Sequence, residues 1–200
     1  MIAVLLRYIV MLSTVSPLAY WSTVALAAVG CAVLCTVARR RPGPWRAVTA
    51  RVLALALAGD AVSYSVGLAV QGTWSPKTSL PLALCDVGVL VAAAACWWRV
   101  VLLVELTYFW GLAGTLQAII TPDLNVGFPK LEFFEYVVAH GAIVCAALFL
   151  VAGQRLAPRR HSVGRVFAIT IAYTAVACRA QAGRACLGFK ADVRARRDHA

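Results

Sequence analysis

The sequence predicts an all-α fold, a polytopic transmembrane helix bundle of about six spans. Of the 200 residues, 62% are hydrophobic and only 14% are charged, whereas soluble domains are about 45–50% apolar and about 25% charged. Apolar runs of the length that crosses a bilayer core alternate with short connections rich in arginine, glycine and proline. These runs are expected to be helical, because hydrocarbon offers no hydrogen-bond partner to an unpaired backbone.

Each predicted span is an apolar run bounded by charged or turn-forming residues. The first run carries no charge and ends at the consecutive arginines Arg39, Arg40 and Arg41. Arg99 alone marks the connection between the third and fourth runs. The spans are expected at residues 16–38, 48–70, 80–97, 100–120, 133–151 and 163–177.

The basic residues are unevenly distributed among the connections, and this predicts the orientation. Ten lie in the connections after the first, third and fifth spans or at the start of the span that follows, whereas the other two connections hold only Lys77 and Lys130. The positive-inside rule places the basic loops in the cytoplasm and the N-terminus outside. The net charge of +11 is therefore interpreted as a topology signal. Since no basic face or nucleic-acid motif is present, membrane lipids are the expected partners and nucleic acid is not.

The two ends of the sequence are less regular than the spans. Arg7, the apolar stretch after it and the small residues from Ala25 to Ala28 imitate a signal peptide. The uncharged run continues to Arg39, however, which favours a retained first helix. Residues 178–200 mix alanine and arginine without helical or strand periodicity. We therefore expect a bundle over residues 1–177, followed by a basic tail that is disordered or an aberrant, truncated C-terminus.

Several polar residues lie within the predicted spans, where a charge is costly and commonly marks function. At 1.5 Å per residue, Cys85 and Asp86 lie about 8–9 Å below the outer boundary, and His140 lies about 12 Å below it. Gln117 lies about 5 Å from the same boundary, and Asp123 belongs to the same outer layer. These residues, which come from different spans, define one slab of the outer leaflet.

A cysteine and a histidine at matching depth form a candidate nucleophile and base. The imidazole of His140 would accept the thiol proton of Cys85, and the thiolate would attack an ester or thioester carbonyl. A structural role is the alternative, since an intramembrane histidine commonly bonds a neighbouring helix. A third interpretation is a polar transport path that also includes Asp60 and Glu105, although neither residue shares the depth of the outer slab.

The sequence does not predict a metal or another cofactor. Two of the three histidines lie outside the apolar spans, and no Cys-x-x-Cys motif is present. Cys31 and Cys35 are one helical turn apart, but no third ligand is evident at their depth. Together with Cys96 and Cys145, they are interpreted as packing residues.

The region between residues 80 and 141 holds several short motifs in a fixed order. They are LPLALCD at 80–86, ELTYFWGLAGTLQA at 105–118, TPDL at 121–124, FP at 128–129, FF at 133–134 and AHG at 139–141. In these motifs the sequence resembles the YwaF-like bacterial integral membrane proteins. The resemblance covers about residues 17–177 and implies a multi-pass protein of the bacterial plasma membrane. Members often carry a histidine two residues before the cysteine, where this chain has Ala83. They usually also continue past the sixth span into a further helix.

The YwaF-like family is distantly similar to a vertebrate transmembrane acyltransferase that transfers fatty acyl chains onto lyso-ether-phospholipids. The positions that match its cysteine and histidine are Cys85 and His140. The resemblance therefore implies a lipid acyltransferase with a lysophospholipid or phospholipid substrate. Asp86, Gln117 and Asp123 would then orient or polarise the reacting groups. A transporter, a channel, a lipid-binding protein or a structural assembly partner are the alternatives.

Overall fold

A computed structural model of the chain describes residues 17–70, 72, 83–122 and 131–198. Helices account for nearly all of these residues, and the described part contains no β-strand. In chain order the helical elements are α2 (Pro17–Arg40), α3 (Trp45–Val70), α4 (Leu84–Trp98), α5 (Val101–Trp110), η1 (Gly111–Thr115), α6 (Leu116–Ile120), α7 (Leu131–Leu148), η2 (Phe149–Gly153) and α8 (Ser162–Asp198). The π-helical segment η1 joins α5 to α6, and the π-helical segment η2 extends α7.

Five of the described helical segments are long and apolar enough to cross a membrane. They are Leu18–Arg40, Trp45–Gly67, Val101–Ile120, Tyr136–Gly153 and Ser162–Ala180. The helix α4 is equally apolar in character but shorter. The prediction of an all-α polytopic bundle is thus confirmed, whereas the orientation of the bundle stays a prediction.

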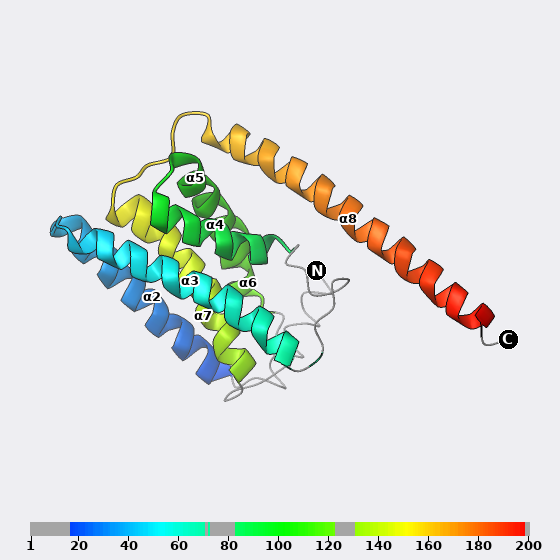
Figure 1. Ribbon diagram of the computed structural model, residues 1–200. Coiled ribbons are helices and arrows are strands. Elements are labelled where there is room, and N and C mark those ends of the chain that lie inside the picture. The colour runs from blue at the N-terminus through cyan, green and yellow to red at the C-terminus, as the bar shows by residue number, and fades with distance from the viewer. Residues whose placement is uncertain (1–16, 71, 73–82, 123–130, 199–200) are drawn as a thin grey trace.

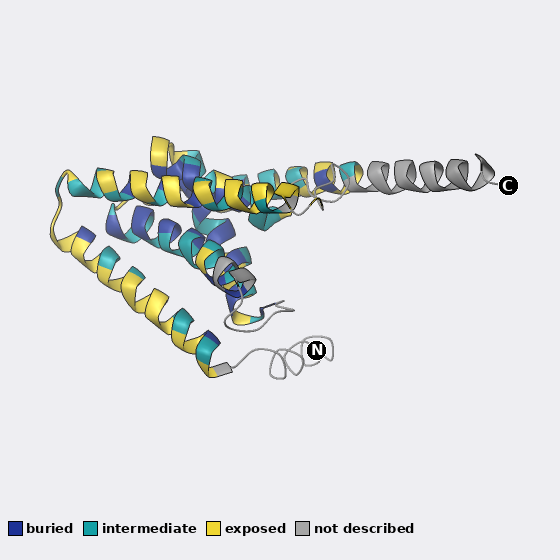
Figure 2. Ribbon diagram, turned by 60° about the horizontal axis from the view of Figure 1, so that its bottom comes forward, coloured by how far each residue is buried: buried dark blue, intermediate teal, exposed yellow. Residues whose placement is uncertain are grey.

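The helix α7 occupies the centre of the bundle. It packs against α2, α3, α4, α5 and α6, while α3 packs against α4 and α4 against α5. The helix α8 begins beside α5 and then extends away from the other helices (Figure 1). Exposed residues dominate the outward faces of α2 and α8, as expected for surfaces that meet lipid (Figure 2).

Small side chains fill the interface of α3, α4 and α7. Ala92, Ala95 and Cys96 of α4 are fully buried there, together with Ala146 of α7. Gly111 in η1 makes a further close approach, because a Cβ atom at this position would lie 3.3 Å from the Cβ of Ala147. Small residues allow helix backbones to approach closely, which favours association where lipid removes the hydrophobic driving force.

Two tyrosines from other helices complete the end of α6. The hydroxyl of Tyr20 donates a hydrogen bond of 2.7 Å to the carbonyl of Ile119, and that of Tyr136 donates one of 2.8 Å to the carbonyl of Ala118. The last carbonyls of a helix have no partner within the helix. Tyr20 and Tyr136 therefore tie α2 and α7 to α6 by satisfying backbone groups that would otherwise be unpaired.

We expect Tyr20→Phe to lower the free energy of unfolding by about 1 kcal/mol, because it removes the partner of the Ile119 carbonyl. The free energy can be measured by denaturing titration in mixed micelles. Tyr64→Phe is the matched control, since Tyr64 is 54% exposed on α3. Equal effects of the two changes would contradict a specific role for the hydrogen bond of Tyr20.

The helix α8 continues beyond the end expected for the sixth span. It runs from Ser162 to Asp198, so residues 178–198 extend the helix in the structure, where the sequence suggested a separate tail. The mixture of alanine and arginine lacks an amphipathic period, yet alanine and arginine both have high helix propensity. The helix propensity of these residues, added to the helical turns that precede them, is sufficient to continue α8.

Candidate outer-leaflet site

His140 is oriented by its own helix. Its Nδ1 atom lies 2.8 Å from the carbonyl oxygen of Tyr136, one turn earlier in α7. A carbonyl can only accept, so this contact assigns the proton of the neutral imidazole to Nδ1 and leaves Nε2 as an acceptor. The rings of Tyr136 and His140 also stack, with centroids 4.2 Å apart and an interplanar angle of 28°. The imidazole is thus held in one orientation with one nitrogen available as a base.

Two carboxylates from neighbouring helices approach His140. Asp60 of α3 and Asp86 of α4 both interact electrostatically with the imidazole. All three side chains are only partly buried. Depth alone does not place Asp60 in this group. Because α3 packs directly against α4 and α7, a residue nearer the middle of the membrane can still interact electrostatically with the histidine.

Cys85 lies in the first turn of α4, directly before Asp86. Its thiol is partly buried and interacts electrostatically with the Asp86 carboxylate. Asp86 therefore lies within electrostatic range of both Cys85 and His140. Ala83 is the N-cap residue of α4 and supplies no side-chain cap, so it lies directly beside the first turn that carries Cys85.

Gln117 and Asp123 are the other two residues that the sequence predicts at the site. The side chain of Gln117 is exposed on α6, where its amide donates a hydrogen bond of 3.2 Å to the hydroxyl of Thr121. A role for Gln117 at the site therefore stays a prediction. Asp123 lies outside the described residues.

Tyr136 and Tyr173 also belong to the surroundings of His140 and Asp86. Tyr136 is one of the aromatic residues that the sequence presents either as the lining of a lipid-facing groove or as packing residues, and it precedes His140 by four residues, so that the two share a helix face. Tyr173 of α8 interacts electrostatically with Asp86. It reaches this position because α8 docks on α5, where the indole Nε1 of Trp110 donates a hydrogen bond of 2.8 Å to Thr170. No local sequence signal indicates that docking.

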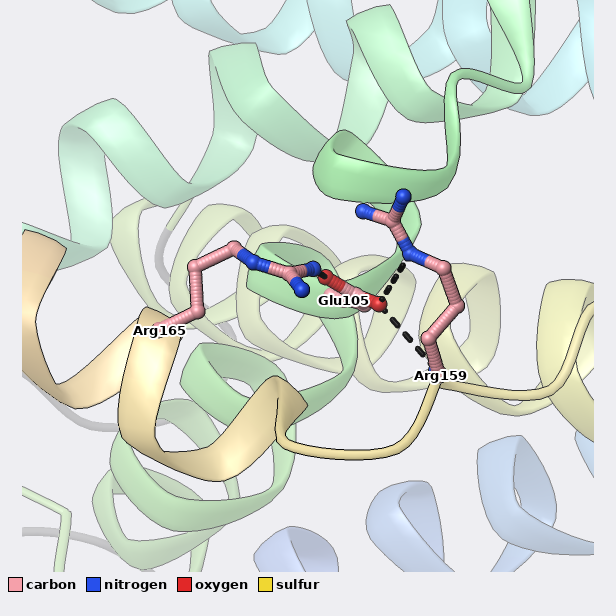
Figure 3. Close-up of polar contacts among 3 residues, drawn as sticks. All are labelled: Glu105, Arg159 and Arg165. Carbon is pink, nitrogen blue, oxygen red and sulfur yellow. Dashed lines mark hydrogen bonds and ion pairs between the residues drawn. The ribbon is translucent and has the colours of Figure 1, made fainter.

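Glu105 forms a separate polar cluster near the connection between α7 and α8. Its carboxylate is fully buried and accepts hydrogen bonds from the backbone N–H and Nε of Arg159, both at 3.1 Å. The other carboxylate oxygen lies 2.8 Å from a terminal guanidinium nitrogen of Arg165 in α8 (Figure 3). Glu105 thus attaches the connection and the start of α8 to α5.

Three cysteines also come together between α2 and α7. The thiol of Cys31 interacts with those of Cys35 and Cys145. Cys145 of α7 therefore lies near the pair formed by Cys31 and Cys35. Among the residues that the structure describes, no group of three or more histidine, cysteine, aspartate or glutamate side chains is arranged to hold a metal ion.

Comparison with known families finds a match that covers most of the chain. The TMEM164 family, a family of transmembrane proteins, matches residues 11–180. Comparison with curated proteins and with solved structures finds no match. The matched region includes every described helix that could span a membrane, and it also includes α4 with Cys85. The chain is therefore a multi-pass membrane protein that belongs to the TMEM164 family.

Proposed function

We propose that the protein is a lipid acyltransferase that works through an acyl-enzyme on Cys85, with His140 as the general base. The proposal rests mainly on Asp86, which interacts with both Cys85 and His140. This carboxylate is adjacent to Cys85 in α4 and interacts with His140 of α7. A second support is the orientation of His140, whose Nδ1 is engaged by its own helix and whose Nε2 is left to accept a proton.

The proposed reaction needs both residues. A thiolate at Cys85 is favoured by the N–H groups of the first helical turn but disfavoured by the neighbouring Asp86 carboxylate, so a base is required. His140 accepts the thiol proton as the sulfur attacks the ester carbonyl of a donor phospholipid. The C–O bond then breaks, the imidazolium protonates the departing alkoxide, and a thioester and a lysolipid result.

The second half of the reaction reverses these steps with another lipid. The hydroxyl of an acceptor lysophospholipid gives its proton to His140 and attacks the thioester carbonyl. The C–S bond breaks, the proton returns to the sulfur, and a new ester is released. Cys85 and His140 do not hydrogen-bond to each other among the described residues, but catalytic hydrogen bonds often form only when substrate is bound.

The other polar residues are proposed to position these two. Asp86 and Asp60 stabilise the imidazolium that forms during each half-reaction, since both interact with His140. Asp123 and Gln117 remain candidates for orienting the lipid head group at the outer surface. The YwaF-like resemblance supports the same chemistry and a location in the bacterial plasma membrane.

The acyl-enzyme can be trapped directly. The full chain is reconstituted in vesicles with a phospholipid that carries an alkyne-tagged acyl chain, and the tag is then detected on the protein. We expect a hydroxylamine-sensitive label on the unmodified chain and its loss in Cys85→Ala. His140→Gln should slow labelling by about 10²–10⁴-fold, as is typical when a general base is removed.

Cys178→Ser provides the matched control, because Cys178 is an exposed thiol on α8, away from the site. This variant should be labelled as fast as the unmodified chain. If Cys85→Ala retains the label, or if Cys178→Ser loses it, Cys85 is not the nucleophile.

The transport alternative makes a different prediction for Glu105. A transport path requires this carboxylate to be accessible, but it is fully buried and bound by Arg159 and Arg165. The contacts therefore favour a structural role for Glu105. Flux of a lipid or ion that depends on Asp60 and is unchanged in Cys85→Ala would instead support transport.

A further inference from the structure

Among the described residues other than glycine, three have a left-handed backbone conformation, and all three are arginine or histidine. They are Arg99, with φ 53°, and Arg155 and His161, each with φ 64°. Arg99 ends α4, where its N–H bonds the carbonyl of Ala95, and Arg155 follows η2. Glycine commonly occupies such positions because a Cβ atom makes this conformation unfavourable. Since a side chain there costs free energy, each of these positions is a place to look for a contact that the side chain makes.

These residues lie at the end of the bundle that carries most of the arginines. Arg159 bonds to Glu105 in the second turn of α5, so the connection that contains Arg155 lies at the same end as Arg99. Among the residues whose side chains the structure describes, which exclude those of 181–198, ion pairs to carboxylates are formed by Arg159 and Arg165, both with Glu105. Arg51 and Arg99 have no acidic partner there. This end of the bundle therefore carries a large excess of positive charge.

Arg51 and Arg99 flank a pair of exposed tryptophans. The guanidinium carbon of Arg51 lies 6.0 Å from the ring centroid of Trp97. Trp97 and Trp98 are 47% and 66% exposed at the end of α4, directly before Arg99. The Nε–H of Arg99 is enclosed and has no acceptor among the described residues. Arginine beside exposed tryptophan at the end of an apolar helix is typical of the level where lipid head groups lie.

We propose that the corner formed by Arg51, Trp97, Trp98 and Arg99 binds the head group of an anionic phospholipid. The guanidinium groups of Arg51 and Arg99 donate hydrogen bonds to phosphate oxygens, a geometry that arginine forms with two parallel bonds. The tryptophans contact the glycerol backbone and the start of the acyl chains. This apolar contact selects a lipid over free phosphate. Under the positive-inside rule, the lipid belongs to the cytoplasmic leaflet.

The site is distinct from the proposed acyl-transfer site. Cys85 lies in the first turn of α4, whereas Trp97 and Trp98 lie in its last turn. At 1.5 Å per residue, Cys85 and Trp98 are about 20 Å apart along the helix. Binding at this corner can therefore be tested without any acyl-transfer assay.

Lipid retention on the full chain tests the proposal. The purified protein is equilibrated in uncharged detergent with phosphatidylglycerol or phosphatidylcholine, and bound lipid is counted by native mass spectrometry. We expect phosphatidylglycerol to be retained at least tenfold better. Arg51→Gln and Arg99→Gly should each reduce that preference about fivefold, which corresponds to the loss of one arginine near a lipid surface. Arg179→Gln, an equal loss of charge at an exposed position of α8, should leave it unchanged.

Arg99→Gly is expected to weaken lipid binding without lowering the stability of the fold. In uncharged detergent it should unfold at the same or a higher temperature than the unmodified chain, because glycine relieves the left-handed backbone. A well-folded variant with a weaker lipid preference cannot be explained by damage to the fold. The proposal is overturned if Arg99→Gly retains the full preference for phosphatidylglycerol, or if Arg179→Gln loses as much. Thermal stabilisation by inorganic phosphate as large as that by phosphatidylglycerol would also overturn it.

Discussion

The double change Arg159→Ala and Arg165→Ala is expected to lower the free energy of unfolding by about 2 kcal/mol more than Glu105→Gln does. The two sides of this cluster differ in burial. The Glu105 side chain is fully buried, whereas the Arg159 and Arg165 side chains are 53% and 38% exposed. Removing the arginines leaves an uncompensated carboxylate inside the protein. Removing the carboxylate leaves guanidinium groups that water or head groups can solvate.

The same asymmetry provides a control for this prediction. Adding Glu105→Gln to the double arginine variant should restore much of the lost stability, because the unpaired buried charge is then gone. Unfolding of all four chains can be followed by denaturing titration in mixed micelles. The explanation is wrong if the double arginine variant and Glu105→Gln lose equal stability, or if the triple variant is the least stable. In either case the buried, unpaired carboxylate of Glu105 would not be the cause of the loss.

A comparably large effect is expected from Gly111→Leu. A Cβ atom at this position would lie 3.3 Å from the Cβ of Ala147 and 3.4 Å from the Cγ2 of Ile143. A leucine must therefore push η1 away from α7, and overpacking of this kind costs about 1–3 kcal/mol. Ile143 follows His140 by three residues in α7, so the displacement should also slow acyl labelling of Cys85.

Gly30→Leu is the matched control for that change. Gly30 lies in α2, and no atom comes within 4 Å of the Cβ position there. Leucine has a better helix propensity than glycine, so this variant should be as stable as the unmodified chain or slightly more stable. We expect the unfolding free energies of the two leucine variants to differ by about 2 kcal/mol. Similar values would mean that the approach of η1 to α7 is not close enough to matter.

The fold class could be predicted from composition because the membrane allows few alternatives. An apolar run such as that before Arg39 has to form a helix in hydrocarbon, whatever its neighbours are. The break at Arg99 was also visible, since an arginine there interrupts an apolar stretch. What the sequence could not provide is which helices meet. The contact of α2 with α7, which brings Cys145 to Cys31, joins segments more than a hundred residues apart.

The candidate site shows the same division between what can and cannot be predicted. Counting residues from the membrane boundary gives only the depth of a side chain in the membrane. His140 and Asp86 are grouped on the basis of that depth. Depth says nothing of the direction in which a side chain points, and so Gln117 was grouped with them although it is exposed on α6. It also neglects the way in which packed helices cross, so depth alone does not group Asp60 with His140, although the two side chains interact electrostatically.

The tyrosine bonds at the end of α6 have a consequence for biogenesis. Helices that enter the lipid one after another need partners for their polar groups. The carbonyls of Ile119 and Ala118 find theirs on other helices, in Tyr20 and Tyr136. Tyr20 is synthesised 99 residues before Ile119, whereas Tyr136 is synthesised after it. The hydrogen bond to Ile119 can therefore form only when the first helix lies beside α6, after α3, α4 and α5 have been added. The α6 end is complete only once α7 has followed, because Tyr136 supplies the second hydrogen bond.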